Sequence, residues 1–213
     1  MRTWAIVVAA GGGTRFGAAK QFALLAGETV LDRSVGVALS ACDGVVVALP
    51  ADAAWNAPDG VLRTAGGATR SDSVRAGLGL VPADAEVVVV HDAARPLASA
   101  RVFERVVRAV ADGADGAVPG LPVADTVKRV AGDRVVETVS REDLVGVQTP
   151  QAFRADVLRA AHHLGGVDTD DAALVESAGG TVVIVEGERR NLKLTLPEDL
   201  AVAEAMLDAS RRR

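Results

Sequence analysis

Two cations stand in a glycine-rich loop close to the N-terminus. Arg15 and Lys20 fall within residues 9–21, which read Ala-Ala-Gly-Gly-Gly-Thr-Arg-Phe-Gly-Ala-Ala-Lys-Gln. Glycines let a backbone come close to a ligand and point its N–H groups at anionic oxygens. Fixed cations in such a loop stabilise the charge that develops when a phosphorus atom is attacked and pyrophosphate leaves. The loop therefore indicates phosphate chemistry, and nucleotidyl transfer suits it.

Two other phosphate-binding loops do not match this spacing. A dinucleotide fingerprint needs Gly-x-Gly-x-x-Gly, but Gly11 and Gly13 are followed by Phe16 at the place of the third glycine. No acidic residue ends a well-formed second strand, where it would hold a ribose. A P-loop needs Gly-Lys-Ser/Thr, whereas Lys20 lies between an alanine and a glutamine. The spacing argues against a dehydrogenase and a P-loop NTPase.

Histidine and cysteine offer little further chemistry. His91 ends an apolar run, where we expect a structural role, and His162 and His163 fall late in a helical pattern, where we expect surface positions. The one cysteine, Cys42, excludes an internal disulfide and a cysteine-based metal site. We expect a buried and unreactive thiol there. A phosphate nucleophile needs no general base, because it is already largely ionised near pH 7.

The composition limits the partners. The chain has 213 residues, 49% of them apolar, which suits one domain with a sizeable core. A net charge of −5 gives no general positive field for DNA or RNA. The apolar opening 4–10 is too short to span a bilayer and does not resemble a signal peptide. We therefore expect a soluble, cytoplasmic protein that binds neither nucleic acid nor membrane.

Alternating apolar runs and helical patterns must position the loop. The predicted strands are 4–10, 44–49, 87–90 and 182–185, and the predicted helices are 30–41, 72–80, 102–111 and 155–164. This alternation predicts an α/β fold with a doubly wound, mostly parallel, Rossmann-like sheet. A loop at the carboxyl end of a parallel strand is where such folds bind ligands. A last helix is expected after Thr195, as its N-cap, with Glu198 completing a capping box.

One segment breaks this rhythm. Residues 126–139 form two short alternating runs around Ala131-Gly132-Asp133, which predicts a β-hairpin. We expect an arm at about 125–145 on a single domain covering 1–213. The apolar face of such an arm needs a cover. A second subunit and the arm's own domain are both possible covers on pattern alone.

Seven separated motifs carry a family resemblance. They are Ala9-Ala10-Gly11-x-Gly13-x-Arg15 with Lys20-Gln21-Phe22; Gly66-Gly67-Ala68-Thr69-Arg70-Ser71-Asp72-Ser73-Val74; His91-Asp92-Ala93-Ala94-Arg95-Pro96; Asp125-Thr126-Val127-Lys128; Gln148-Thr149-Pro150-Gln151; Thr169-Asp170-Asp171; and Asn191-Leu192-Lys193-Leu194-Thr195. Together, over nearly the whole chain, they resemble the 2-C-methyl-D-erythritol 4-phosphate cytidylyltransferases of the non-mevalonate isoprenoid pathway. The resemblance implies CMP transfer from CTP to that polyol phosphate, with Mg²⁺ or another divalent cation, in a nucleotidyltransferase fold.

The resemblance also implies residue roles. Arg15 and Lys20 would stabilise the transition state. The implied nucleotide-binding residues are Ala9, Ala10, Gly11, Gly13, Gly67, Arg70, Ser73, Asp92 and Ala93. The implied substrate-binding residues are Arg95, Thr126, Arg141, Thr169 and Lys193, of which Arg141 and Lys193 would position the attacking phosphate. Asp92 would lie near the metal, directly or through water. In the family the arm exchanges between two subunits, so Arg141 would serve the partner's site in a homodimer.

Several alternatives stay open. The loop before Lys20 is shorter than is common in the family, and Ala68 stands where an acidic residue is frequent. The acceptor could be another polyol phosphate, such as ribitol 5-phosphate. A nucleotide-binding regulatory module without turnover would not need Arg15, Lys20 and Lys193 together. Some of these residues could have structural roles instead. Arg95 could merely pair with Asp92. Either Thr69 or Ser71 could cap the next helix, and Thr169 could cap a helix over 170–177.

Overall fold

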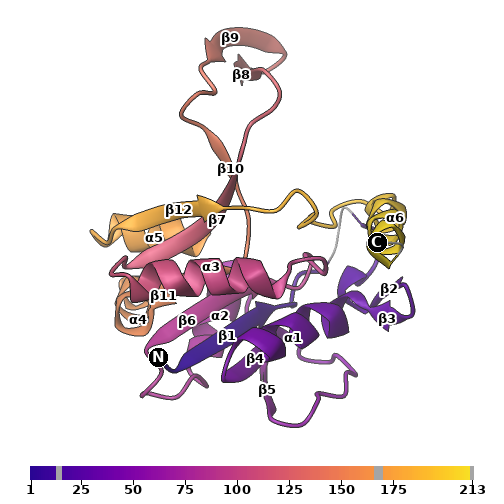
Figure 1. Cartoon of the computed structure of the whole chain (residues 1–213), viewed down its shortest axis with the longest axis vertical. Helices are drawn as coiled ribbons and strands as arrows, with labels where there is room; N and C mark the ends of the chain where they lie inside the picture. The colour runs from indigo at the N-terminus through magenta and orange to yellow at the C-terminus, as the bar shows by residue number, and fades with distance from the viewer. Residues whose placement is uncertain (13–15, 166–169, 212–213) are drawn as a thin grey trace.

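An eight-stranded sheet forms the centre of the molecule (Figure 1). The computed structural model describes residues 1–12, 16–165 and 170–211. The strands of the sheet are β1 (Thr3–Val8), β4 (Gly44–Leu49), β5 (Val61–Ala65), β6 (Val87–Asp92), β7 (Gly116–Pro122), β10 (Val145–Val147), β11 (Gln151–Arg154) and β12 (Val182–Glu186). Their order is β10-β7-β11-β6-β1-β4-β5, and β12 pairs with β7. All pairings are parallel except those of β10 and β11.

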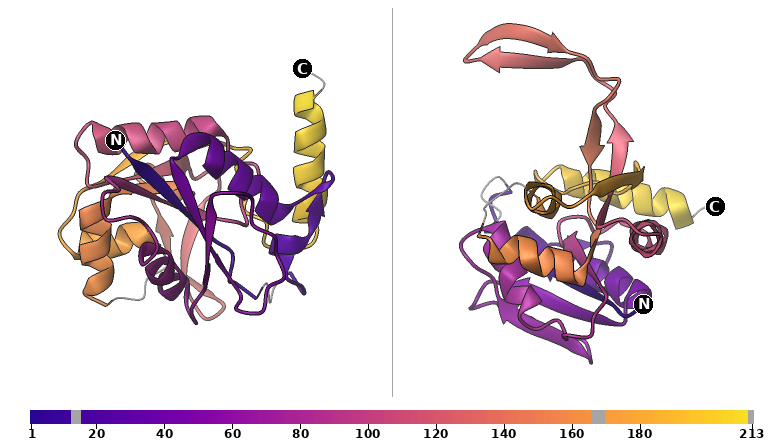
Figure 2. Two further views of the ribbon diagram at one scale, coloured as in Figure 1. Left: turned by 90° about the horizontal axis from the view of Figure 1, so that it is seen from below. Right: turned by 90° about the vertical axis from the view of Figure 1, so that its left-hand side faces the viewer.

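Helices cover both faces of this sheet (Figures 1 and 2). Along β1 the side chains alternate, so that Ala5 and Val7 join one core and Trp4 and Ile6 join the other. Helices α1 (Val30–Ala41) and α3 (Ala100–Ala111) supply the first core. Helices α2 (Arg70–Leu78), α4 (Ala155–His163) and α5 (Asp171–Ser177) supply the second. The predicted doubly wound α/β fold is therefore confirmed.

A smaller cluster joins the C-terminal helix to the chain after the glycine-rich loop. This part contains the one-turn 3-10 helix η1 (Lys20–Phe22) and the short strands β2 (Leu24–Leu25) and β3 (Glu28–Thr29). Leu25 and Val30 pack there with Leu194 and with Ala203 of α6 (Asp199–Arg211). Residues far apart in the sequence are thereby held beside Lys20.

The predicted capping box of the last helix, with Thr195 as N-cap and Glu198 as its partner, is wrong. Helix α6 begins at Asp199, and the carboxylate of Asp199 accepts hydrogen bonds from the backbone N–H groups of Thr195 (2.6 Å) and Leu196 (2.8 Å). Glu198, the expected partner, lies in the preceding turn. Pro197 lies in the same turn. Thr195 therefore lies four residues before the helix, and its hydroxyl donates to the carboxylate of Asp199 (3.0 Å) instead of capping the helix.

The hairpin is present and projects from the sheet (Figures 1 and 2). It consists of β8 (Val127–Ala131) and β9 (Arg134–Val139), which pair antiparallel around the turn at Gly132. Its valines Val130, Val135 and Val136 are between 55 and 60% exposed. The arm therefore does not fold back onto its own domain, and its apolar side chains face away from the core.

The thiol of Cys42 is half-buried at the C-terminal end of α1. Burial, together with the neighbouring charge of Asp43, raises the pKa of this thiol to about 12. Since a thiol reacts as its thiolate, Cys42 is unreactive at neutral pH, as expected from the sequence.

Helix α2 approaches β1 so closely that a side chain at Gly77 would require the helix or Ile6 to move. A Cβ at Gly77 would lie 2.6 Å from Cγ2 of Ile6, whereas one at Gly36 of α1 would meet nothing within 4 Å. Replacing a helical glycine by alanine gains about 1 kcal/mol of helix propensity, but overpacking a core costs about 1–3 kcal/mol. We expect Gly77→Ala to lower the free energy of unfolding by about 1 kcal/mol and Gly36→Ala to raise it by about 0.5–1 kcal/mol. Urea unfolding measures both, and equal stability of the two variants would contradict the packing described.

Candidate functional site

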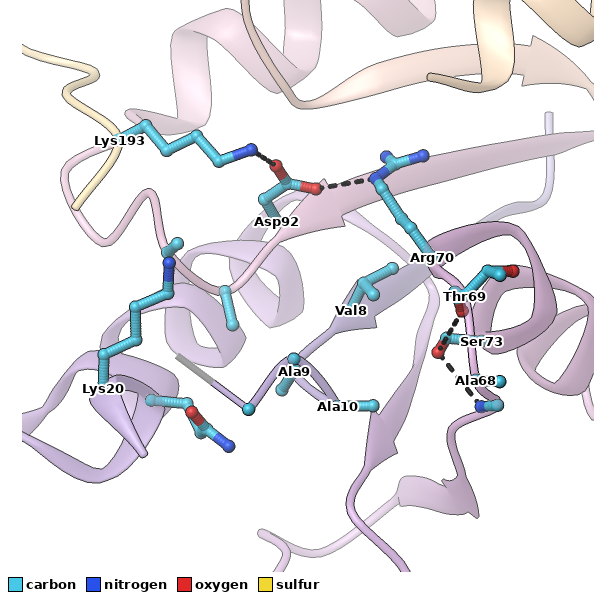
Figure 3. A pocket seen from close by; sticks show the side chains of 16 residues that line it. Val8, Ala9, Ala10, Lys20, Ala68, Thr69, Arg70, Ser73, Asp92 and Lys193 are labelled. Atoms are coloured by element: carbon cyan, nitrogen blue, oxygen red, sulfur yellow. Dashed lines mark hydrogen bonds and ion pairs between the residues drawn. The ribbon is translucent and has the colours of Figure 1, made fainter. Parts of the chain in front are cut away.

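A cavity opens where the loops after β1 and β6 leave the carboxyl edge of the sheet (Figure 3). The residues that line it are Val8, Ala9, Ala10, Gly11, Gly12, Lys20, Gln21, Gly67, Ala68, Thr69, Arg70, Ser73, Asp92, Ala93, Ala94 and Lys193. The structure thus brings together eight of the nucleotide-binding residues predicted from the sequence, with Lys20 and Lys193 beside them. Gly13 and Arg15, also predicted, lie outside the described residues.

Asp92 ends β6 between two cations. Its Oδ1 is 3.1 Å from Nε of Arg70, and its Oδ2 is 2.8 Å from Nζ of Lys193 (Figure 3). Burial tends to raise the pKa of this carboxyl, but Arg70 and Lys193 outweigh burial and hold the pKa well below its usual range. The backbone N–H of Asp92 donates to the hydroxyl of Thr149 (3.0 Å). Asp92 is therefore an ionised and fixed group at the centre of the cavity.

The wall beside Arg70 depends on glycine and on a helix cap. A Cβ at Gly67 would lie 2.1 Å from Cβ of Asp72, so only glycine fits at this approach. Ser73 holds the turn, because its hydroxyl donates to the carbonyl of Thr69 and accepts from the N–H of Gly67, both at 3.1 Å. Of the two possible caps, Thr69 is the one used, and it forms a capping box with Asp72 at the start of α2.

Lys20 is held by the chain segment that also carries Lys193. Its Nζ donates to the carbonyl oxygen of Leu194 at 2.9 Å. Leu194 is buried, and its own N–H donates to the carbonyl oxygen of Ala94 (2.8 Å). We call residues 188–195 the C-terminal strap, because they cross the open side of the cavity between β12 and α6. The strap places one lysine on Asp92 and restrains the other.

Buried amides hold the C-terminal strap. Gln148 donates from Nε2 to the carbonyl of Glu188 (2.9 Å), and its Oε1 accepts from the N–H of Glu188 (3.1 Å). Asn191 donates from Nδ2 to the carbonyl of Thr149 (2.8 Å). Since these amides are buried, losing one partner would leave the other unsatisfied at a cost of about 1–3 kcal/mol.

Arg95 belongs to the same network. Its Nη1 donates to the carbonyl oxygen of Asn191 at 2.8 Å, and its Nη2 donates to that of Val147 at 3.4 Å. The alternative that Arg95 merely pairs with Asp92 is wrong, because Asp92 bonds to Arg70 and Lys193 instead. Arg95 therefore joins the C-terminal strap to β10.

A second cavity continues from the first. Its lining residues are Arg70, Asp92, Arg95, Val147, Gln148, Thr149, Gln151, Asp170 and Lys193. Arg70, Asp92 and Lys193 line both cavities, so two ligands can meet at these three side chains. Sequence reasoning gave no role to Gln148, Thr149, Gln151 or Asp170. The signal for the first three was a polar stretch, Gln-Thr-Pro-Gln, directly before a buried strand.

Two further predicted substrate residues, Thr126 and Arg141, line neither cavity of their own chain. Arg141 is exposed at the base of the arm, where its Nη1 donates to the carbonyl of Ala124. Thr126 is exposed at the start of the same arm. Thr169 lies outside the described residues, and the helix cap proposed for it belongs to Asp170, whose carboxylate accepts from the N–H of Ala173 (3.0 Å).

The described residues offer no preformed metal site. No group of three or more His, Cys, Asp or Glu side chains among them could hold a metal ion. Within the same part of the chain, Asp92 is the one carboxylate that lines the first cavity, and each of its oxygens already contacts a cation. A metal ion there would take most of its ligands from water or from a bound ligand.

Two of the three histidines are buried, whereas the sequence predicted this for only one of them. His91 is buried as expected, with Nδ1 3.2 Å from the hydroxyl of Thr149 and its ring tilted against Phe103. The surface position expected for His162 is wrong. His162 is buried, and its Nε2 lies 2.9 Å from Oδ1 of Asp171, because α4 packs against α5. His163 is exposed.

Burial of His91 makes stability depend on pH. Burial is the main cause that lowers its pKa to about 4, from an ordinary 6.5. Between these values the unfolded chain takes up a proton that the folded chain does not, so stability falls as the pH falls. We expect the stability of the wild type, relative to His91→Gln, to drop by about 2 kcal/mol from pH 7.5 to pH 5. Urea unfolding at the two pH values measures this, and a difference independent of pH would contradict it.

Comparisons with known proteins give the chain a family. The family model described as IspD, 2-C-methyl-D-erythritol 4-phosphate cytidylyltransferase, matches residues 3–209. A 2-C-methyl-D-erythritol 4-phosphate cytidylyltransferase from Saccharopolyspora erythraea is 50% identical over 97% of this chain and 100% of its own length. The crystal structure of the enzyme of that name from Thermus thermophilus superimposes with a TM-score of 0.85, at 38% identity, over 98% of this chain and 100% of that one.

Other relatives are longer. A bifunctional IspD/IspF enzyme from Anaeromyxobacter dehalogenans is 46% identical over 98% of this chain. This chain spans only 57 to 58% of the length of such bifunctional relatives. The family model covers the sheet, both cavities and the arm, and the chain belongs to the 2-C-methyl-D-erythritol 4-phosphate cytidylyltransferase (IspD) family.

Proposed function

We propose that this chain transfers CMP from CTP to the phosphate of 2-C-methyl-D-erythritol 4-phosphate. The products are 4-diphosphocytidyl-2-C-methyl-D-erythritol and pyrophosphate, in isoprenoid precursor synthesis. The observation that carries the proposal is the pair of adjoining cavities, which share Arg70, Asp92 and Lys193. Such a pair fits a reaction in which a nucleotide and a second phosphorylated molecule must meet. Membership of the family supports the same assignment.

The first cavity suits the nucleotide. Its glycine-lined end has room for a base beside Gly67 and Ser73, with backbone groups exposed to it. Its other end has Lys20, whose ammonium group can hold the phosphates that leave as pyrophosphate. We assign Arg15 to the same task through its place in the loop. With Ala68 in the wall, base selection rests chiefly on backbone groups.

Magnesium fits this site as part of the nucleotide complex. Mg²⁺ prefers oxygen ligands and is commonly bound by substrate phosphates with one or two carboxylates. Asp92 would contact it through water, because both oxygens of Asp92 are engaged by Arg70 and Lys193. The ion would neutralise charge on the triphosphate when bound.

The second cavity suits the acceptor. Lys193 and Arg95 supply positive charge for its phosphate, and Thr149, Gln151 and Asp170 supply partners for its hydroxyl groups. The attacking phosphate oxygen needs no general base, since the second pKa of a phosphate monoester is about 6. Catalysis would then consist of aligning the two phosphates and stabilising charge, which is the task of fixed cations.

The direct test is pyrophosphate release. With Mg²⁺ and 2-C-methyl-D-erythritol 4-phosphate, we expect release from CTP, less from UTP and little from ATP or GTP. Lys20→Ala should lower kcat by about 10²–10³, because a fixed donor to the developing charge is lost. Arg108→Ala, whose side chain is 84% exposed on α3, is the matched control and should match the wild type. Comparable kcat/KM for CTP and ATP would reject the nucleotide assignment, and faster release with ribitol 5-phosphate would reassign the acceptor.

The arm completes the proposal. We infer a cytoplasmic homodimer in which each arm reaches the partner's site. Arg141 lies at the base of the arm and lines neither cavity of its own chain, and the exposed Val130, Val135 and Val136 need a cover. An exposed hairpin with an apolar face is a ready contact for a second copy. Arg141 and Thr126 would then bind the acceptor of the neighbouring chain.

Mixed dimers test this sharing of residues. Each homodimer of Lys20→Ala and of Arg141→Ala should be nearly inactive. In a mixed dimer, one site carries both changes and the other carries neither. Random pairing at equal amounts makes about half of all dimers mixed, so activity should rise toward roughly a quarter of the wild-type value. Differently tagged chains verify that mixed dimers have formed. Their presence without any gain of activity would place Arg141 in its own chain's site.

A further inference from the structure

A buried carboxylate lies behind the nucleotide cavity. Asp171 is the first residue of α5, and its side chain is 0% exposed. Its Oδ2 accepts a hydrogen bond from Nη1 of Arg70 at 2.6 Å. Its Oδ1 lies 2.9 Å from Nε2 of His162, which therefore donates, because a carboxylate only accepts. Asp171 lines neither cavity, so it reaches ligands only through Arg70.

The burial of this charge lowers stability unless its partners compensate for the lost hydration. Removing two charges from water costs several kcal/mol each, and an apolar replacement of a buried ion pair is often neutral or stabilising. The ion pair of Asp171 with Arg70 is therefore weak evidence for a role in stability. It is better explained by geometry, since both oxygens of Asp171 are held by groups from two different helices, α2 and α4.

The geometry in question is that of Arg70. Its guanidinium donates one hydrogen bond from Nε to Asp92 and another from Nη1 to Asp171. Burial opposes its charge, but Asp171 and Asp92 outweigh burial and hold the pKa of Arg70 above its usual value. The third nitrogen, Nη2, is buried and has no hydrogen-bond partner within the part of the chain that is described. Because a guanidinium is planar and rigid, the contacts of its two held nitrogens fix the orientation of the whole group.

We propose that Asp171, itself held by His162, is a positioning residue that fixes the guanidinium of Arg70 in the wall of the first cavity, where the nucleotide binds. The inference rests on the proposed function, since it takes the ligand of the first cavity to be CTP. Without Asp171, the guanidinium keeps only its contact with Asp92 and can rotate about it. Helices α4 and α5, which contribute little else to the first cavity, would thus act on CTP binding.

The test is the affinity for CTP in the presence of Mg²⁺, measured by calorimetry, together with KM and kcat. Asp171→Asn keeps the shape of the side chain but removes its charge. We expect the dissociation constant and KM for CTP to rise about tenfold, and KM for the polyol phosphate to change less. His162→Gln should weaken CTP binding in the same direction but by a smaller factor. Glu176→Gln, on the exposed face of α5, is the matched control and should bind CTP as the wild type does.

A double-variant cycle separates positioning from stability. In an Arg70→Ala background, Asp171→Asn should weaken CTP binding by less than twofold, because it acts through Arg70. An equal loss in both backgrounds would show a structural role and overturn the proposal. If Asp171→Asn does not fold, His162→Gln decides, and unchanged CTP affinity in the folded variant overturns the proposal. A wild-type chain that binds no CTP would reject the proposed function as well, whereas wild-type affinity in folded Asp171→Asn would reject this inference alone.

Discussion

The arrangement of the site depends on one carboxylate, Asp92, held between Arg70 and Lys193 at 3.1 and 2.8 Å. These three side chains come from β6, from the start of α2 and from the C-terminal strap, so they join three separate segments of the chain at the carboxyl edge of the sheet. Asp92 is buried, and a buried carboxylate is stable only if it keeps its partners, since an unpaired buried charge costs several kcal/mol. This constraint explains the polar network around it. Gln148, Asn191 and Arg95 all hold main chain that would otherwise let Lys193 move away.

Much of this site could be predicted from the sequence, because its nucleotide end is built from local signals. A β-branched run followed by glycines places Ala9 to Gly11 at the end of a buried parallel strand without any knowledge of tertiary contacts. Asp92 follows from the same reasoning, directly after His91 at the end of the run 87–90. The hairpin at 126–139 is equally visible, because alternation and a central glycine are features of the segment itself.

What could not be predicted depends on contacts between distant residues. Lys193 and Asp92 are 101 residues apart, and nothing in either segment shows that they meet. Strand β7 contains two prolines and two glycines, and β11 has only four residues, so neither gives a strand pattern, although together they carry the antiparallel half of the sheet. The surface position predicted for His162 fails for the same reason. Its place in the helical pattern suggests an exposed residue, and only the packing of α5 against α4 encloses it beside Asp171.

The strap also sets an order in which the site can form during synthesis. Residues up to Ala94 contain the glycine wall and Asp92, so these parts of the first cavity are synthesised first, because translation proceeds from the N-terminus. Lys193 and the carbonyl of Leu194 leave the ribosome about a hundred residues later, after β7, β11 and β12 have become available for pairing. Asp92 is therefore synthesised long before Lys193, its partner in the ion pair, and the first cavity is complete only when the strap has been added.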